Sequence, residues 1–198
     1  MAARAAKDPA STTAAVAGSA FSTVATFVQL ALLFLTISRP TLVLMAPVLG
    51  ADALTAALYG LAFALRTVTP GGTTDAKPGR AFSVGTALGL AAMMAVMLVL
   101  AAALRAWLGE LGVTIGAVVG GFVDTHAAAI SISSLVASDS MSPKDAVLPI
   151  LAAMTSNTVA KIAMAIGGGS RGFALRIAPG LVAPIAAAGA VAFLTVFR

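Results

Sequence analysis

The chain has 198 residues, of which 60% are hydrophobic and only 10% charged, and its mean hydropathy is +1.03. Soluble domains carry roughly a quarter charged residues, so we predict an all-α, polytopic membrane helical bundle with the lipid bilayer as its surroundings. The absence of cysteine excludes disulfides, thiol catalysis and thiolate metal sites. The net charge of +5 is spread along the chain without a basic cluster, which excludes nucleic acid as an expected partner.

About six transmembrane helices are predicted from apolar runs of about twenty residues or more, the length that crosses a hydrocarbon core. They cover residues 14–37, 41–65, 82–104, 111–137, 145–167 and 175–197. The residues before them are polar, so we divide the chain into a polar N-terminal segment, 1–13, and a single transmembrane helical domain, 14–198. The first apolar run is too long for a cleaved signal peptide, and we expect it to remain as a helix.

The connections between these helices contain residues that break helices. Ser38-Arg39-Pro40 predicts a tight turn, residues 69–80 form the longest loop, and residues 105–110 form a short amphipathic connection. Pro143 predicts a helix start, and the glycines of segment 167–172 predict the end of the fifth helix.

The lysines and arginines outside the spans predict the orientation of the chain. Those expected on the side of the N-terminus are Arg4, Lys7, Arg66, Lys77, Arg80, Lys144 and Arg198, and those on the other side are Arg39, Arg105, Arg171 and Arg176. This excess favours both termini in the cytoplasm.

A weak internal repeat relates the first two predicted helices to the last two. Thr23-Val24-Ala25 matches Thr158-Val159-Ala160, and the segment Met45–Leu49 resembles Ile177–Leu181. The two pairs are an even number of spans apart, so we expect them to point the same way, as parallel repeats do.

Four ionisable residues fall within the predicted spans: Asp52, Asp124, His126 and Lys161. A charged side chain at the bilayer centre costs roughly 2.5–3.5 kcal/mol on insertion scales, so these groups must face one another, water or protein.

Helical spacing predicts which of these groups meet. In the fourth predicted helix one stripe joins Gly120, Gly121, Asp124, Ala128 and Ser131, and in the fifth one face joins Ile150, Met154, Asn157, Lys161 and Met164. We predict an ion pair between Asp124 and Lys161, supported by Asn157.

Two interpretations of this cluster stay open. In one, Asp124, Asn157 and Lys161 line a hydrated ion path, with Ser156 and Thr158 beside them and Asp52 opposite. In the other, the ion pair is structural and locks two helices together. For Asp52 by itself we favour a cap on a helix kinked by Pro47 and Gly50.

His126 is two positions from Asp124, so a continuous helix points it to nearly the opposite face. That geometry excludes a Ser-His-Asp triad, and no further ligands are available for zinc. We expect His126 to bond to another helix, with a proton relay as the alternative. The sequence therefore predicts no enzyme, no cofactor and no metal.

The segments GGFVDTHAAAIS and AAMTSNTVAKIAMAIGGGSRGFALRIAPG resemble an uncharacterised multi-pass domain that follows the MgtC/SapB-type module in bacterial membrane proteins. The matching positions are Gly121, Asp124 and Ala127, then Ser156, Asn157, Thr158 and Lys161, then Gly168, Gly169 and Arg171. His126 stands where that family has a second acid, which weakens any role needing two carboxylates.

The resemblance is strongest over residues 79–193 and implies a bacterial inner-membrane location without an established activity. The chain begins as though partway through the domain, so we expect its N-terminal part to be missing. We therefore hypothesise a transport or channel-like domain for a small ion, with coupling to protons left open. The alternative is a non-transporting membrane module that assembles with or regulates an MgtC-like partner. The expected protein partner is an MgtC-like membrane protein or a further copy of this chain.

Overall fold

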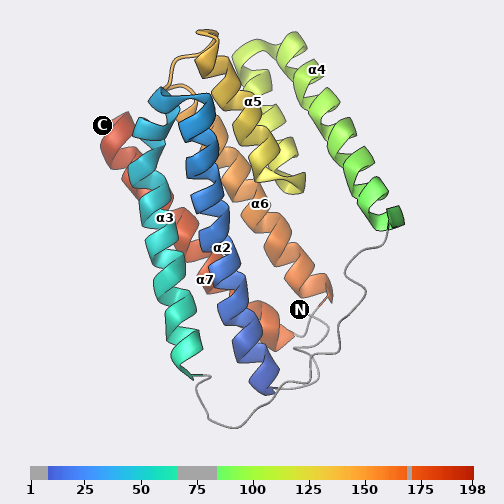
Figure 1. Cartoon of the computed structure of the whole chain (residues 1–198), viewed down its shortest axis with the longest axis vertical. Helices are drawn as coiled ribbons and strands as arrows, with labels where there is room; N and C mark the ends of the chain where they lie inside the picture. Colours follow the sequence, from blue (N-terminus) through green and yellow to red (C-terminus); the bar gives the residue numbers. More distant parts are fainter. Residues whose placement is uncertain (1–8, 67–83, 169–170) are drawn as a thin grey trace.

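The computed structural model of the chain describes residues 9–66, 84–168 and 171–198, and within these ranges every regular element is a helix. The order is α2 (Pro9–Ile37), α3 (Arg39–Arg66), α4 (Val84–Val123), α5 (Thr125–Ala137), α6 (Val147–Gly168), α7 (Arg171–Ala192) and the π-turn η1 (Phe193–Phe197). The predicted helical bundle is confirmed (Figure 1). The predicted polar segment up to residue 8, the loop at 69–80 and Gly169 lie outside the described residues.

The first two predicted helices are confirmed as α2 and α3, which pack side by side. A single residue, Ser38, separates them. Its buried hydroxyl accepts a hydrogen bond from the backbone N–H of Thr41 at 3.4 Å and contacts the Thr41 hydroxyl at 2.9 Å. A serine in this place caps the first turn of α3, which explains the predicted tight turn.

The predicted connection at residues 105–110 is confirmed in position but is shorter than predicted, because the helix on either side continues almost to the bend. The chain bends at one residue, Gly109, whose φ of 57° lies in the left-handed region. Glycine has no Cβ and takes this conformation at little cost. The first part of α4, residues 84–108, covers most of the third predicted span. Figure 1 shows it tilted away from the other helices.

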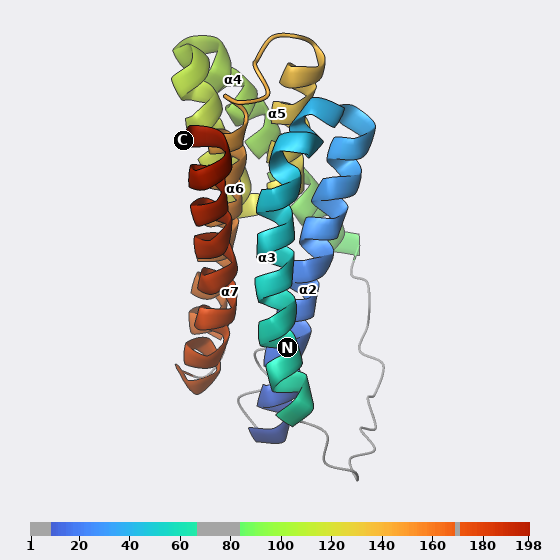
Figure 2. The ribbon, with the colours of Figure 1, turned by 90° about the vertical axis from the view of Figure 1, so that its left-hand side faces the viewer.

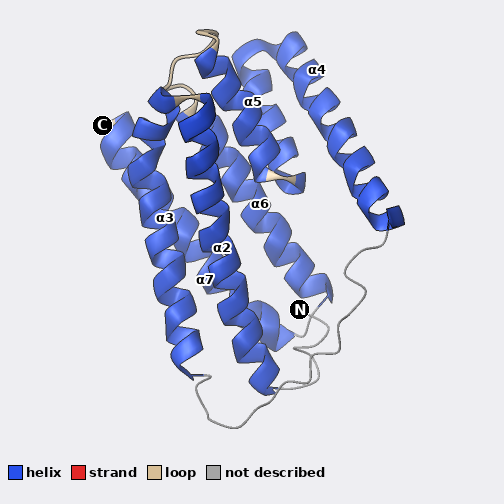
Figure 3. Ribbon diagram, in the orientation of Figure 1, coloured by secondary structure: helices blue, strands red, loops and turns tan. Residues whose placement is uncertain are grey.

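The fourth predicted span, residues 111–137, is also wrong, since it is two helices that meet at Asp124. Asp124 is extended, with φ −157° and ψ 115°, and both short helices are apolar. The 13 residues of α5 are roughly 20 Å long, too short for a hydrocarbon core of about 30 Å. In Figure 3 the joint between the two short helices lies partway along the bundle. From there α5 runs back to the upper end, where the second part of α4 begins. We call residues 111–137 the hairpin.

The two remaining helices begin close to their predicted positions. The turn before α6 has Ser142 as its cap: its hydroxyl donates to the Asp145 carboxylate at 2.6 Å and accepts from the Asp145 N–H at 3.2 Å. Pro143 follows this cap, where its missing N–H costs nothing. α7 starts at Arg171, earlier than predicted, and contains Pro179 and Pro184.

The hairpin changes the direction of the last two helices. In Figures 1 and 2, α2 starts at the lower end and α3 returns to it, whereas α6 starts at the upper end and α7 ends there. The pairs α2–α3 and α6–α7 therefore run in opposite senses, so the expected parallel arrangement is wrong. That the pairs are copies of each other stays a prediction.

Small residues bring the helices together, while large apolar side chains cover the outside. At the α3–α7 contact the ring of Tyr59 lies over Gly180, and its hydroxyl donates to the Arg176 carbonyl. Outward side chains such as Val43 and Leu175 stay exposed. Among the described residues four helices are long and apolar enough to span a membrane: Thr13–Ile37, Arg39–Arg66, Val147–Gly167 and Gly172–Phe197. An apolar exterior on such helices is typical of a lipid-facing bundle.

Candidate functional site

Asp124 caps the start of α5 at the tip of the hairpin. One carboxylate oxygen, Oδ1, accepts the N–H of His126 at 3.0 Å, and the other, Oδ2, accepts the N–H of Ala127 at 3.2 Å. The first N–H groups of a helix have no partner within it, and inside a membrane water does not replace one. The Asp124 carboxylate therefore satisfies two backbone N–H groups at the tip, and these N–H groups are no longer available to bind an anion.

The helix break also brings His126 to Asp124, contrary to the prediction that the two face opposite ways. Nδ1 of His126 lies 2.9 Å from Oδ1 of Asp124, and both side chains are partly exposed, at 29% and 26%. The other ring nitrogen, Nε2, is buried and has no hydrogen-bond partner. The expected bond from His126 to another helix is thus not formed, because the partner is the neighbouring cap.

The tip packs closely against the middle of α6 through Gly121. A Cβ at this position would lie 2.6 Å from the Cα of Ala153 and would also collide with the Ala153 carbonyl oxygen and the Ser156 hydroxyl. Ala153 and Ser156 are both buried. Only glycine allows this approach, so the hairpin tip is fixed at the level of the TSNTVAK motif.

All three hydroxyls of that motif bond to their own helix. Thr155, Ser156 and Thr158 donate to carbonyls one turn earlier, at 2.8, 3.0 and 3.0 Å. Asn157 is half-buried and forms no hydrogen bond with any other described residue. The residues of the two predicted stripes are not uniformly buried. In the first stripe Ser131 lies beyond the helix break and is exposed, whereas Ser133, outside the stripe, is buried. In the second stripe, on α6, Met164 is 66% exposed.

The prediction that Asp52 caps a kinked helix is wrong. α3 continues through Pro47, and Asp52 lies about midway along it with 0% of its surface exposed. Neither carboxylate oxygen has a hydrogen-bond partner. The helix end that needs a carboxylate is at Asp124 instead.

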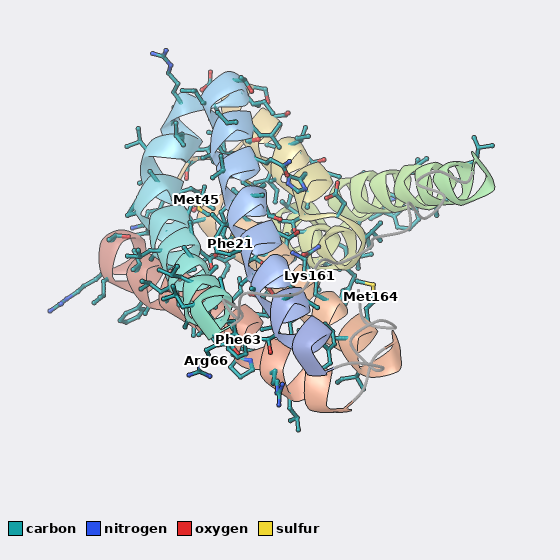
Figure 4. All side chains as sticks on the ribbon, turned by 60° about the horizontal axis from the view of Figure 1, so that its bottom comes forward. Phe21, Met45, Phe63, Arg66, Lys161 and Met164 are labelled. Carbon is teal, nitrogen blue, oxygen red and sulfur yellow. The ribbon has the colours of Figure 1, made fainter. Side chains whose placement is uncertain are left out.

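The predicted ion pair between Asp124 and Lys161 is not formed. Within the described part of the chain, the one close contact between a carboxylate and a basic side chain is that between Asp124 and His126. Lys161 is half-buried, and the Asp52 carboxylate forms no hydrogen bond with it. Figure 4 shows Lys161 near the middle of the molecule.

The chain can be assigned to a family on sequence similarity. The profile of a family described as "Domain of unknown function (DUF4010)" matches residues 1–169, which is most of the chain. The chain belongs to this family. No curated protein and no solved structure has significant similarity to it.

The DUF4010 match covers every polar group of the site: Asp52, Asp124 and His126, with Asn157 and Lys161 of α6. Among the described residues no group of three or more His, Cys, Asp or Glu could hold a metal ion. The arrangement offers single carboxylates, one imidazole and one ammonium, which can exchange protons or balance one another's charge. The sequence contained all of these residues, but its pattern did not indicate the helix break at Asp124.

Proposed function

We propose that the chain is a membrane transport or channel-like domain for a small cation, coupled to protons. The observation that carries the proposal is the apolar hairpin, whose polar tip stops inside the bundle at the level of Ala153 and Ser156, next to Asn157. Interrupted helices place backbone and polar groups near the bilayer midplane, where many transporters bind their ions. Polar groups of this kind inside a membrane commonly mark pathways.

The opposite senses of α2–α3 and α6–α7 support the same proposal. Many secondary transporters contain two inverted halves with the binding site at their interface. Here the two pairs meet through α3 and α7, and Asp52 and Lys161 come from different pairs.

The test is ion flux in proteoliposomes that contain the chain. Asp124→Asn keeps a residue that caps helices well but removes the charge, so the variant should fold while its flux falls at least tenfold. Asp139→Asn, an exposed position next to the hairpin, is the matched control and should retain full flux. Equal flux in all three proteins, or in empty liposomes, would exclude transport by this route.

For the location we propose a bacterial inner membrane with the start of α2 facing the cytoplasm. This end of the bundle carries Arg66, Arg171 and Arg176. In the sequence, Arg4 and Lys7 precede α2, and Lys77 and Arg80 follow α3. Fewer cationic residues belong to the other end: Arg39, Arg105, Lys144 and Arg198. The excess still favours a cytoplasmic N-terminal end. Because the hairpin turns back, Arg198 is then on the opposite side, which replaces the expectation of two cytoplasmic termini.

A second candidate function is a non-transporting module that assembles with an MgtC-like membrane protein or with its own copies. It is favoured by residues 84–108, which diverge from the rest of the bundle (Figure 4) and carry exposed Leu88, Val96 and Val99. Co-purification of an MgtC-like protein with the chain in mild detergent, with no flux in either sample, would support this function over transport. A monodisperse chain that carries flux by itself would oppose it.

A further inference from the structure

The centre of α3 contains an acid for which the surrounding protein provides no partner. Asp52 is fully buried, and no donor reaches either of its oxygens. An ionised carboxylate in such surroundings is very costly, whereas a neutral carboxylic acid is tolerated. The geometry therefore fits the protonated form of Asp52.

Few other ionisable groups lie on the helices that pack against α3. α2 has none, α5 has His126 at its start, and α7 has Arg171 and Arg176 in its first turns. α3 itself carries Arg39, Tyr59 and Arg66 towards its ends, and α6 has Lys161. Among these side chains, Lys161 is the one cation that lies within the body of its helix rather than near an end.

Lys161 is placed to receive the carboxylate once a proton leaves it. α3 and α6 both start at the upper end of the bundle, and each residue lies about four turns from the start of its helix. α3 contacts α6, and no hydrogen bond joins the two side chains in this structure.

We propose that Asp52 is the proton-binding site of this domain and that Lys161 controls release of the proton. The O–H bond of the Asp52 carboxyl breaks, its electron pair stays on the carboxylate, and the proton passes to water. The Lys161 ammonium then neutralises the carboxylate, so release is coupled to a movement between α3 and α6. The inference rests on the proposed transport function and names its coupling ion.

A proton suits this place better than a metal cation. A proton needs one oxygen atom, whereas a dehydrated calcium ion takes six or more oxygen ligands. The described residues provide no cluster of carboxylates, and a nearby ammonium repels a further cation. Asp124 is not available for this role, because both of its oxygens are bonded to the start of α5.

The direct test is infrared spectroscopy of the purified chain in lipid nanodiscs, over a range of pH. We expect the carbonyl stretch of one protonated carboxylic acid at neutral pH, lost in Asp52→Asn and retained in the control Asp139→Asn. Labelling of aspartate carboxyls with ¹³C should shift this band without any substitution, which covers the case in which Asp52→Asn does not fold. In Lys161→Met the band should persist at least one pH unit higher, a tenfold gain in proton affinity.

Absence of the band at neutral pH, its survival in Asp52→Asn, or an unchanged titration in Lys161→Met would overturn the inference. Loss of the band on adding sodium chloride, but not choline chloride, would assign the carboxylate to sodium and would also overturn it. The measurement needs no flux. A titrating band without flux would refute the transport function alone, and flux without the band would refute only the role of Asp52.

Discussion

Asp52 and Asp124 are both aspartates deep in an apolar bundle, yet their surroundings differ in almost every respect. Asp124 lies at a helix break, is partly exposed, and bonds to two backbone N–H groups and to His126. Asp52 lies within a continuous helix, is fully buried, and bonds to nothing. The first carboxylate is part of the backbone structure, and the second is free to change its state of protonation.

The comparison shows that depth in a membrane does not define what a carboxylate does. The decisive quantity is how many of its hydrogen bonds the fold already supplies. A carboxylate satisfied by a helix start stabilises that start, and its removal should affect folding. A carboxylate without partners contributes no hydrogen bond to the fold, which leaves it free for chemistry.

The largest effect on stability should come from Gly121, which lies in the hairpin just before Asp124. Gly121→Leu introduces side-chain atoms where only glycine fits against Ala153 and should cost at least roughly 3 kcal/mol of unfolding free energy. Gly50→Leu is the matched control, since no atom lies within 4 Å of a Cβ there. Thermal unfolding in mild detergent measures both. Equal stability of the two variants would refute the close contact of the hairpin with α6.

Lys161 should distinguish the two acids in double-mutant cycles. The pair Asp52→Asn and Lys161→Met should show a coupling energy of roughly 0.5–3 kcal/mol in unfolding experiments. The pair Asp124→Asn and Lys161→Met should be additive within about 0.5 kcal/mol, because the structure places no ion pair between them. The reverse pattern would restore the ion pair predicted from helical spacing.

Removal of each carboxyl group should change stability in opposite directions. Asp124→Ala deletes the cap of α5 and should cost about 0.5–2 kcal/mol, while Asp124→Asn should retain most of the stability. Asp52→Leu replaces a carboxyl without hydrogen bonds and should be neutral or stabilising. Unfolding curves of the three variants measure this. A large loss in Asp52→Leu would mean that its carboxylate has a structural partner.

The smallest effect should come from His126→Phe. The contact with Asp124 is partly exposed, and such pairs contribute about 0–1 kcal/mol, while the change also removes a buried nitrogen without a partner. Stability in detergent should therefore change by no more than about 1 kcal/mol. A loss as large as that of Asp124→Ala would show that the imidazole is an essential part of the hairpin tip.

The amphipathic and apolar patterns predicted the helices well where a run ends at a clear signal, as at Ser38 or Pro143. They failed at Asp124 because the helical spacing of small residues continues past it, and no proline or glycine occupies the joint itself. A signal was present: two glycines, then an aspartate of the type that caps helices, in a run longer than one span needs.

The partners of the polar groups were harder to predict than the groups themselves. The proximity of Asp124 to TSNTVAK was anticipated from helical spacing and is seen in the contact of Gly121 with Ser156. The relative positions of Asp52 and Lys161 depend on how α3 and α6, far apart in the sequence, pack in the bundle. Only the packed bundle contains that information.

The hairpin also has a consequence for how the protein enters the membrane during its synthesis. Neither of its helices is long enough to be recognised by the insertion machinery as a separate stop, and its tip would leave backbone groups and a carboxylate among lipid tails. The surface that accepts the tip belongs to α6, which emerges later from the ribosome. The hairpin must therefore wait for α6 before it takes its final depth, so this segment completes its assembly after translation has passed it.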